Sequence, residues 1–272
     1  MKTRPIFILL FFVSFLKAQK PFVIGEIKEL PSRILNETRT INVYLPEGYD
    51  KDTAHYAVIY LLDGAADEDF IHISGLVQFN SFEWINRVPK TIVIGIANTD
   101  RKRDFTFPSA VKEEQTKYPT AGHSDKFISF LETELIPFVK ANYKTGSNTT
   151  LIGQSLGGLL ASEILLKKPA LFNHYVIVSP SLWWDNGSLL NYKSEALKSA
   201  AKTKIFIAVG KEGKGLGATD RTMEEEAKLL EQKISSMHVR TIDSKFEYLP
   251  EEDHATILHQ AVMNAFKWLY SK

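Results

Sequence analysis

Residues 148–168, "NTTLIGQSLGGLLASEILLKK", place a single serine, Ser155, among glycines at the point where a β-branched run gives way to a helix-forming one. A structural turn needs at most one such glycine. Further glycines beside the serine indicate that other groups must come close to its hydroxyl. The segment from Gly153 to Gly157 matches the GxSxG nucleophile elbow, a tight strand-to-helix turn that exposes the serine oxygen above a sheet. The stretch therefore predicts an α/β fold with Ser155 as a nucleophile.

The order of elements along the rest of the chain agrees with that fold. Apolar, β-rich runs alternate with segments of helical spacing, and the middle runs are continuously apolar, as in a parallel sheet covered on both faces. We expect strands at 39–46, 56–64, 91–98, 149–155, 174–181, 203–210 and 244–252. We expect helices at 124–143, 156–168, 221–236 and 255–272. This alternation predicts an α/β fold with a mainly parallel central sheet flanked by helices on both faces.

The composition limits the classes of function. The 272 residues carry a formal net charge of +1, with 24% charged side chains spread evenly, so no basic stripe for nucleic acid is present and no nucleic-acid partner is expected. The chain has no cysteine, which excludes a thiol nucleophile and a thiolate metal site. With 44% hydrophobic residues it can bury one large core, and we expect a single domain over residues 20–272.

The N-terminus has the form of a signal peptide. Lys2 and Arg4 precede an apolar run over residues 6–16, which is too short to span a bilayer, and Ala18 is a small residue suited to cleavage. We therefore expect residues 1–19 to be removed and the mature protein to be exported to a periplasm or to the medium. A buried first helix or an uncleaved anchor is the alternative. Without a cysteine for lipidation, no stable membrane insertion is expected after cleavage.

Chain order selects the catalytic base. A serine hydroxyl is a poor nucleophile until a base takes its proton, and in this fold the serine is followed first by the acid and then by the histidine. His238, His254 and His259 lie late enough in the chain. Of these, His254 alone follows an expected strand and precedes the last helix, so it is the predicted base. His238 ends a helix, and His259 lies inside the terminal one.

The acid is expected after the strand at 203–210. Glu212 in "GKEG" is the first choice, and Asp220 in "GATD" is the second. Asp253 ranks third, because a residue adjacent to His254 does not easily reach round to orient that ring. An ordinary surface carboxylate is the alternative interpretation for Glu212 and for Asp220.

Two backbone N–H groups are candidates for an oxyanion hole. Leu156 follows the serine at the start of a helix, where its N–H is positioned to stabilise an oxyanion. The second donor usually comes from the loop after an earlier strand. Asp63 and Gly64 make a turn there, which points to the N–H of Ala65, although an ordinary Asp-Gly turn would have the same sequence.

Two other kinds of site are not indicated. The cluster "GKEGKGLG" at 210–217 follows a strand, but its spacing is not GxGxxG and no Lys-Ser or Lys-Thr pair closes it, so nucleotide binding is not expected. No HExxH or comparable ligand spacing is present either. We therefore expect neither a cofactor nor a metal.

Several longer motifs resemble one esterase family of α/β hydrolases, which includes enterochelin and salmochelin esterases, esterase D, feruloyl esterases and the mycobacterial mycolyltransferases. The similarity covers nearly the whole mature chain. It rests on "VIYLLDG", "DRKRDFTFP", "DKFISFLETELIPFVKANYKT", "LIGQSLGGLLASEILLKKPALFNHYVIVSPSLWWD" and the late histidine. These look most like the branch of the periplasmic siderophore trilactone esterases, and "SPSLWWD" is far more specific than GxSxG alone. The resemblance implies an α/β-hydrolase fold for residues 20–272.

The resemblance also implies roles for individual residues. In the family the residue after the Asp-Gly turn gives the second oxyanion N–H, which supports Ala65. An arginine in the loop that here reads "RKRDFT" makes Arg103 a candidate for the pocket wall, or alternatively a partner of Asp104 or a cap of the loop. Trp183 and Trp184 offer a rigid surface for an aromatic or glycosyl acyl group, with core packing as the alternative for one of them. Some of these esterases work with a Ser/His dyad, which leaves the acid open.

Together these observations predict a secreted serine carboxylic ester hydrolase that works through an acyl-enzyme on a small-molecule ester. Siderophore lactones and feruloyl or acyl sugar esters are the two candidate substrate classes. A catalytically inactive ligand-binding protein on a hydrolase scaffold and an acyltransferase are the competing functions. The long polar segment 98–123, broken by Pro108 and Pro119, is a candidate functional loop.

Overall fold

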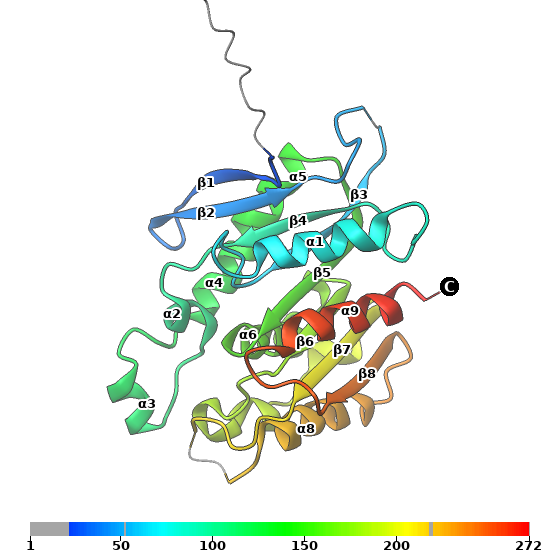
Figure 1. Ribbon diagram of the computed structural model, residues 1–272. Coiled ribbons are helices and arrows are strands. Elements are labelled where there is room, and N and C mark those ends of the chain that lie inside the picture. The colour runs from blue at the N-terminus through cyan, green and yellow to red at the C-terminus, as the bar shows by residue number, and fades with distance from the viewer. Residues whose placement is uncertain (1–21, 52, 218–219, 272) are drawn as a thin grey trace, which may run out of the picture.

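The chain is organised around one eight-stranded sheet (Figure 1). The computed structural model describes residues 22–51, 53–217 and 220–271, so the expected signal peptide at 1–19 lies outside the described residues. The strands are β1 (Glu26–Ser32), β2 (Glu37–Tyr44), β3 (Tyr56–Leu61), β4 (Thr91–Ile96), β5 (Thr145–Gln154), β6 (His174–Val178), β7 (Thr203–Gly210) and β8 (Ile242–Leu249). Their spatial order is β1-β2-β4-β3-β5-β6-β7-β8.

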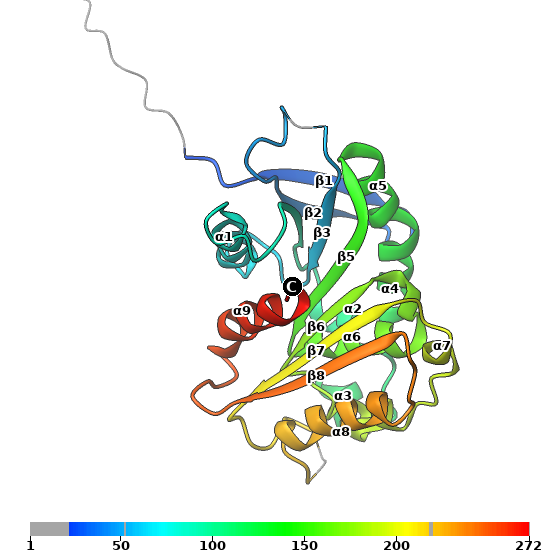
Figure 2. The ribbon, with the colours of Figure 1, turned by 90° about the vertical axis from the view of Figure 1, so that its right-hand side faces the viewer.

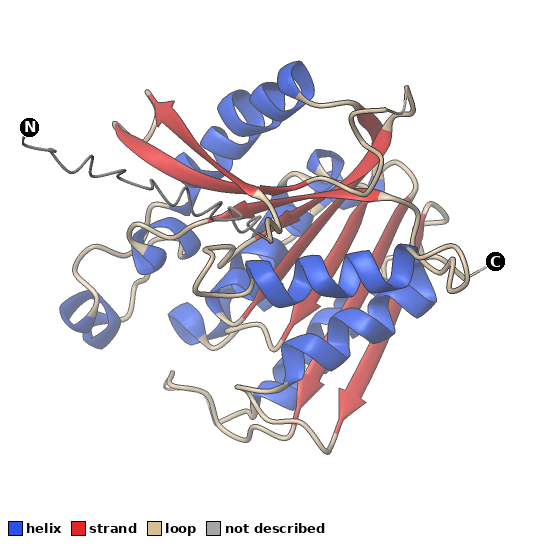
Figure 3. Cartoon of the chain, turned by 45° about the horizontal axis from the view of Figure 1, so that its top comes forward, coloured by secondary structure: helices blue, strands red, loops and turns tan. Residues whose placement is uncertain are grey.

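Six of these strands run parallel to one another. Every neighbouring pair from β4 to β8 is parallel, and only the β1–β2 and β2–β4 pairs at one edge are antiparallel. All residues of β4 are buried, which explains why its sequence is continuously apolar. Figure 3 shows these strands as arrows pointing the same way, with loops at their tips. The carboxyl ends of the parallel strands therefore meet at one edge, where ligands bind in such sheets.

Helices cover both faces of the sheet (Figure 2). One face is packed by α1 (Phe70–Ser81) and α9 (Ile257–Leu269), which share an apolar cluster with the inner strands. The other face is packed by α4 (Ser124–Phe130), α5 (Ile136–Asn142), α6 (Leu156–Lys167) and α8 (Met223–Ser235). The shorter elements are α2 (Arg101–Phe105), α3 (Lys112–Lys117), η1 (Leu131–Leu135), η2 (Pro169–Leu171), η3 (Trp184–Asn191) and α7 (Glu195–Lys198). Within the described ranges, no helix is both long and apolar enough to cross a membrane.

This architecture confirms the predicted α/β-hydrolase fold. All seven expected strands are present, and the four expected helices correspond to α4 to α5, α6, α8 and α9. The expected set lacks the edge strand β1 and helix α1, as well as the short elements α2, α3, η2, η3 and α7. In α1, the apolar side chains of Ile71 and Phe79 are exposed, which blurs the one-sided stripe by which a helix is recognised in sequence.

Candidate active site

Ser155 occupies the sharp turn between β5 and α6. Its φ of 58° and ψ of −120° are strained for a residue that carries a side chain. The glycines make this turn possible, because a Cβ at Gly153 would lie 2.4 Å from the carbonyl oxygen of Gly157. A Cβ at Gly158 would lie 2.8 Å from the carbonyl oxygen of Val178 on β6. The sequence "GQSLGG" thus folds as a tight elbow at the carboxyl end of β5.

Glu212 and His254 meet beside this elbow. Glu212 follows β7 and His254 follows β8, and Nδ1 of the histidine lies 2.5 Å from Oε2 of the glutamate. The Glu212 side chain is 2% exposed, whereas that of His254 is 45% exposed. The carbonyl oxygen of His254 accepts a hydrogen bond from Nε2 of Gln154 at 2.5 Å. The histidine is therefore tied to the acid through its ring and to the elbow through its backbone.

A cavity of about 260 Å³ lies at this edge of the sheet. The residues that line it are Ser155, Ser181, Trp183, Glu212, Lys214, Gly215, Leu216, Met223 and His254. The structure thus brings Ser155, Glu212 and His254 together from three different loops. Oγ of Ser155 lies 3.3 Å from Oγ of Ser181, a neighbour that the sequence pattern did not single out. Among the described residues, no three His, Cys, Asp or Glu side chains are grouped as a metal site requires.

The other candidates for the acid and the base are not among the lining residues of this cavity. Asp220 is fully exposed and pairs with Lys214. The carboxylate of Asp253 accepts hydrogen bonds from two N–H groups of the turn that follows it. The ring of His259 stacks on a histidine of α1, and His238 is exposed after the end of α8. All four residues are thus exposed and do not line the cavity.

The two expected oxyanion donors lie after β3 and after β5. Leu156 is the first residue of α6, and the first N–H groups of a helix have no partner within the helix. Ala65 follows the turn after β3, in which Asp63 has a positive φ of 54°. The N–H of Ala65 donates to Oε2 of Glu68 at 3.2 Å. This N–H therefore binds an anionic oxygen of the chain itself.

Arg101 connects the turn after β3 to the elbow, although the motif pattern did not single it out. Its Nε and Nη2 donate to the two carboxylate oxygens of Asp63, at 2.5 Å and 2.9 Å. Nη2 also donates to the carbonyl oxygen of Gln154, the residue before the elbow serine, at 3.2 Å. Burial acts to lower the pKa of Arg101, but the interactions with Asp63 and the charges of Glu68 and Asp69 together outweigh it and raise that pKa. The guanidinium is thus a fixed cation between the two loops.

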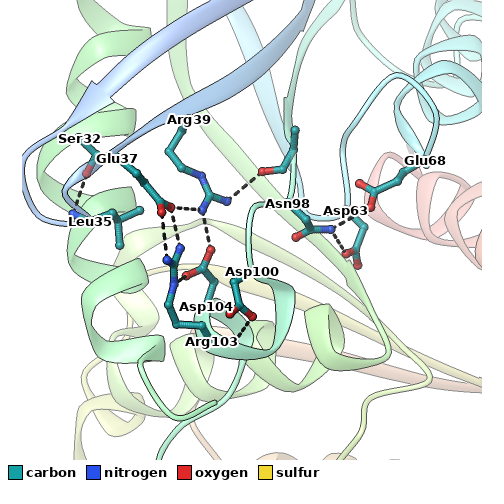
Figure 4. Close-up of polar contacts among 11 residues, drawn as sticks. Ser32, Leu35, Glu37, Arg39, Asp63, Glu68, Asn98, Asp100, Arg103 and Asp104 are labelled. Atoms are coloured by element: carbon teal, nitrogen blue, oxygen red, sulfur yellow. Dashed lines mark hydrogen bonds and ion pairs between the residues drawn. The ribbon is translucent and has the colours of Figure 1, made fainter. Parts of the chain in front are cut away.

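Arg103 belongs to a network of ion pairs, and not to the cavity wall (Figure 4). It pairs with Glu37 and with Asp104, and both carboxylates also pair with the fully buried Arg39. The bonds to Glu37 and Asp104 raise the pKa of Arg103, and the bond from Arg103 lowers the pKa of Glu37. Arg103 is therefore a partner of Asp104, and the network ties α2 to β2.

The two adjacent tryptophans have different surroundings. Trp183 lines the cavity, and the glycine-rich loop packs so closely on it that a Cβ at Gly215 would lie 2.3 Å from its ring. Trp184 is buried, and its Nε1 donates to the carbonyl oxygen of Phe107 at 2.8 Å. Both tryptophans are thus buried, but Trp183 lines the cavity and Trp184 does not.

The segment 98–123 is anchored along its length. Besides the bond from Trp184 to Phe107, the N–H of Ala110 donates to Oδ1 of Asp185 at 2.7 Å. Glu114 on α3 accepts from the N–H of Asp185 in return. Together with the ion pairs of α2, these bonds hold the segment against η3.

Comparison with known proteins agrees with this geometry. The family model described as Putative esterase matches residues 32–256, a range that contains the elbow, Glu212 and His254. The ferri-bacillibactin esterase BesA of Bacillus subtilis is 27% identical over 261 residues, which cover 89% of this chain and 88% of that protein.

Two solved structures show the same fold over nearly the whole described chain. An IroE-like serine hydrolase from Shewanella oneidensis is 30% identical with a TM-score of 0.80, covering 90% of this chain and 80% of the other. The BES protein from Bacillus cereus is 26% identical with a TM-score of 0.80, covering 96% of this chain and 100% of the other. The chain belongs to the Putative esterase family, and its reaction class is carboxylic ester hydrolysis.

Proposed function

We propose that this chain is a secreted serine esterase in which Ser155 is the nucleophile, His254 the general base and Glu212 the acid that orients the histidine. One observation carries the proposal. A strained serine, a histidine and a buried carboxylate converge on one cavity, and the histidine and the carboxylate are 2.5 Å apart. A protein that only binds its ligand has no need for a strained elbow or for a buried acid behind a histidine.

In the proposed mechanism, Oγ of Ser155 attacks the ester carbonyl carbon while His254 takes the hydroxyl proton. Because Nδ1 of His254 is held by Glu212, Nε2 is the nitrogen that exchanges this proton. The tetrahedral intermediate then breaks its bond to the leaving alcohol, which takes the proton from His254. Water attacks the resulting acyl-enzyme by the same route, which releases the carboxylic acid and restores Ser155.

The N–H groups of Leu156 and Ala65 would stabilise the negative oxygen of the tetrahedral intermediate. An oxyanion at Ala65 replaces the Glu68 carboxylate that this N–H binds in the structure. Glu68 also accepts from Nδ2 of Asn98, so its carboxylate keeps a partner when it withdraws (Figure 4). The exchange of one anion for another lets the N–H groups stay in place for the transition state.

The substrate class that we favour is an ester of a siderophore, cleaved at its lactone. The name of the Bacillus subtilis relative supports this class. A second support is that Trp183 lines the cavity together with Ser155, where its indole would contact an aromatic acyl group. The same contact would suit a feruloyl sugar ester, which makes that class the second candidate.

We place the mature protein outside the cytoplasm. Three features of the sequence support this location: the basic residues Lys2 and Arg4, the apolar run at 6–16, and the small residue Ala18 that follows the run. Mass spectrometry of the protein from periplasmic and culture-medium fractions should find a new N-terminus close to residue 19. A full-length chain confined to the cytoplasm would contradict this placement.

The test of the proposed function compares the wild type with Ser155→Ala on three substrates. These are a short-chain aryl ester, a feruloyl sugar ester and a catecholate trilactone. The wild type should hydrolyse the trilactone with the highest kcat/KM, and Ser155→Ala should lose activity on all three by several orders of magnitude. Activity on the feruloyl ester alone would show that the substrate is a feruloyl sugar ester and not a siderophore lactone. Transfer of the acyl group to an added alcohol in preference to water would indicate an acyltransferase.

The nucleophile can be identified without knowing the substrate. A fluorophosphonate probe should form a covalent adduct with the wild type, and peptide mapping should place this adduct on Ser155. Ser181 is the informative alternative, because its hydroxyl is adjacent. An adduct on Ser181, or labelling that persists in Ser155→Ala, would overturn the assignment.

A further inference from the structure

Ser179 presents a buried hydroxyl to the side of Glu212 that faces away from His254. It follows β6, its side chain is inaccessible to solvent, and its Oγ donates a hydrogen bond to Oε1 of Glu212. The N–H of Gly210 donates to the same oxygen at 3.1 Å. The other oxygen, Oε2, is the one that His254 contacts. One carboxylate oxygen thus accepts from Ser179 and Gly210, and the other contacts the histidine.

The backbone of Glu212 is held as firmly as its side chain. Its N–H donates to Oε1 of Glu224, on the first turn of α8, at 2.8 Å. The N–H of Gly213 donates to the same carboxylate. Burial acts to raise the pKa of Glu224, but these N–H donors outweigh it and lower that pKa, so Glu224 is a charged anchor. The carboxylate of Glu212 can still rotate about its terminal torsion, χ3, which has broad and shallow preferences.

The backbone of Ser179 is unfavourable for its residue type. Its φ is 43°, a left-handed conformation in which glycine or asparagine costs less than serine. The following residue is Pro180, and proline disfavours helical conformations in the residue before it. A serine in such a position indicates that its hydroxyl contributes something that glycine would not. The contact with Glu212 is the interaction that this hydroxyl makes.

We infer that Ser179 is a positioning residue that fixes the carboxylate of Glu212, so that Oε2 stays directed at Nδ1 of His254. The inference rests on the proposed function, since it assigns a support to the proposed acid. Without the Ser179 hydroxyl, Oε1 keeps one N–H donor, and the carboxylate can turn away from the histidine. The imidazolium that forms during attack then loses part of its stabilisation.

The test is a double-mutant cycle between Ser179 and Glu212. Ser179→Ala should lower kcat by about 10- to 100-fold, the size of effect that follows misplacement of a catalytic group, with little change in KM. Glu212→Ala should lower kcat further. In the Glu212→Ala background, Ser179→Ala should change kcat by less than about two-fold, because the group through which it acts is gone. A purely structural role would give the same loss in both backgrounds.

Two further variants keep the test decisive. Ser162→Ala removes another fully buried serine hydroxyl, one that donates to a backbone carbonyl within α6, and should leave kcat unchanged in both backgrounds. Ser179→Gly removes the hydroxyl but suits the positive φ, so it should fold even if Ser179→Ala does not, and should show the same fall in kcat.

The outcomes separate this inference from the proposed function. If Ser155→Ala and His254→Ala are inactive but Ser179→Gly keeps kcat within two-fold of the wild type, the positioning role is wrong and the mechanism stands. An equal loss of kcat from the Ser179 change in both backgrounds also overturns the positioning role. If Ser155→Ala stays active, the proposed function itself fails.

Discussion

Nδ1 of His254 lies 2.5 Å from Oε2 of Glu212, although the two residues are 42 positions apart in the chain. The two residues follow the carboxyl ends of β8 and β7, which are neighbouring parallel strands. The sheet alone therefore brings them to one edge. Because the carboxylate is buried, its attraction to a positive imidazolium is weakened by solvent less than that of a surface pair would be.

Glu212→Gln should preserve folding but lower kcat by about 10³- to 10⁴-fold, as expected when a histidine loses the carboxylate that sets its tautomer. The matched change is Asp220→Asn, which alters a fully exposed carboxylate of the same loop and should leave kcat unchanged. Steady-state kinetics on an aryl ester measures both. If both variants stay within a few-fold of the wild type, the enzyme works as a Ser155/His254 dyad. A critical Asp220 beside a dispensable Glu212 would reassign the acid.

The sheet and the order of the site residues could be predicted because both depend on chain order. A buried parallel strand gives an unmistakable apolar run, and the fold places serine, acid and histidine after successive strands. Chain order alone makes Glu212 the first choice for the acid. Ser179 could not be found in the same way, since its contact depends on a left-handed backbone conformation before a proline.

Only the structure distinguishes the roles of nearby residues of the same type. Arg101 and Arg103 lie two positions apart on a one-turn helix, and residues at that spacing do not face the same way. One therefore contacts Asp63 beside the elbow, and the other contacts Glu37 on β2. A sequence pattern that contains "RKR" does not decide between them.

Trp183→Ala should raise KM for a feruloyl or catecholate ester by about ten-fold, or about 1.4 kcal/mol, because the aromatic wall of the cavity is lost. An acetyl ester has no ring to stack, so its KM should change little. Trp84→Ala removes an exposed tryptophan after α1 and serves as the control for both substrates. Equal increases in KM for the acetyl and the aromatic esters would show that Trp183 supports the loop and does not contact the acyl group.

Arg39→Met should destabilise the fold by about 3 to 5 kcal/mol, since it removes the fully buried cation that neutralises Asp104. Arg39 also donates to the carbonyl oxygen of Ala97, which would lose a partner. Urea unfolding followed by circular dichroism measures the effect. Arg33→Met changes an exposed arginine of the same hairpin and should stay within about 0.5 kcal/mol of the wild type. A loss below about 1 kcal/mol for Arg39→Met would mean that Arg103 compensates for it.

His174 should make the stability of the protein depend on pH in the mildly acidic range. It begins β6, and burial, with nearby Lys204 and Lys202, lowers the pKa of its imidazole below the ordinary value of 6.5. Above pH 6.5 the ring is neutral in both the folded and the unfolded chain, so its contribution is fully present. As the pH falls below 6.5, the unfolded chain binds a proton that the folded chain still excludes. The free energy of unfolding should therefore fall through this window.

Urea unfolding of the wild type and of His174→Gln at pH 7.5, 6.5 and 5.5 tests this dependence. Glutamine keeps a polar side chain at the position but cannot take up a proton in this range. Between pH 6.5 and 5.5, the free energy of unfolding should fall less in the variant than in the wild type. Between pH 7.5 and 6.5, the two free energies should differ by a nearly constant amount, because the imidazole has only begun to titrate. Parallel curves over the whole range would show that the proton responsible for the pH dependence binds elsewhere.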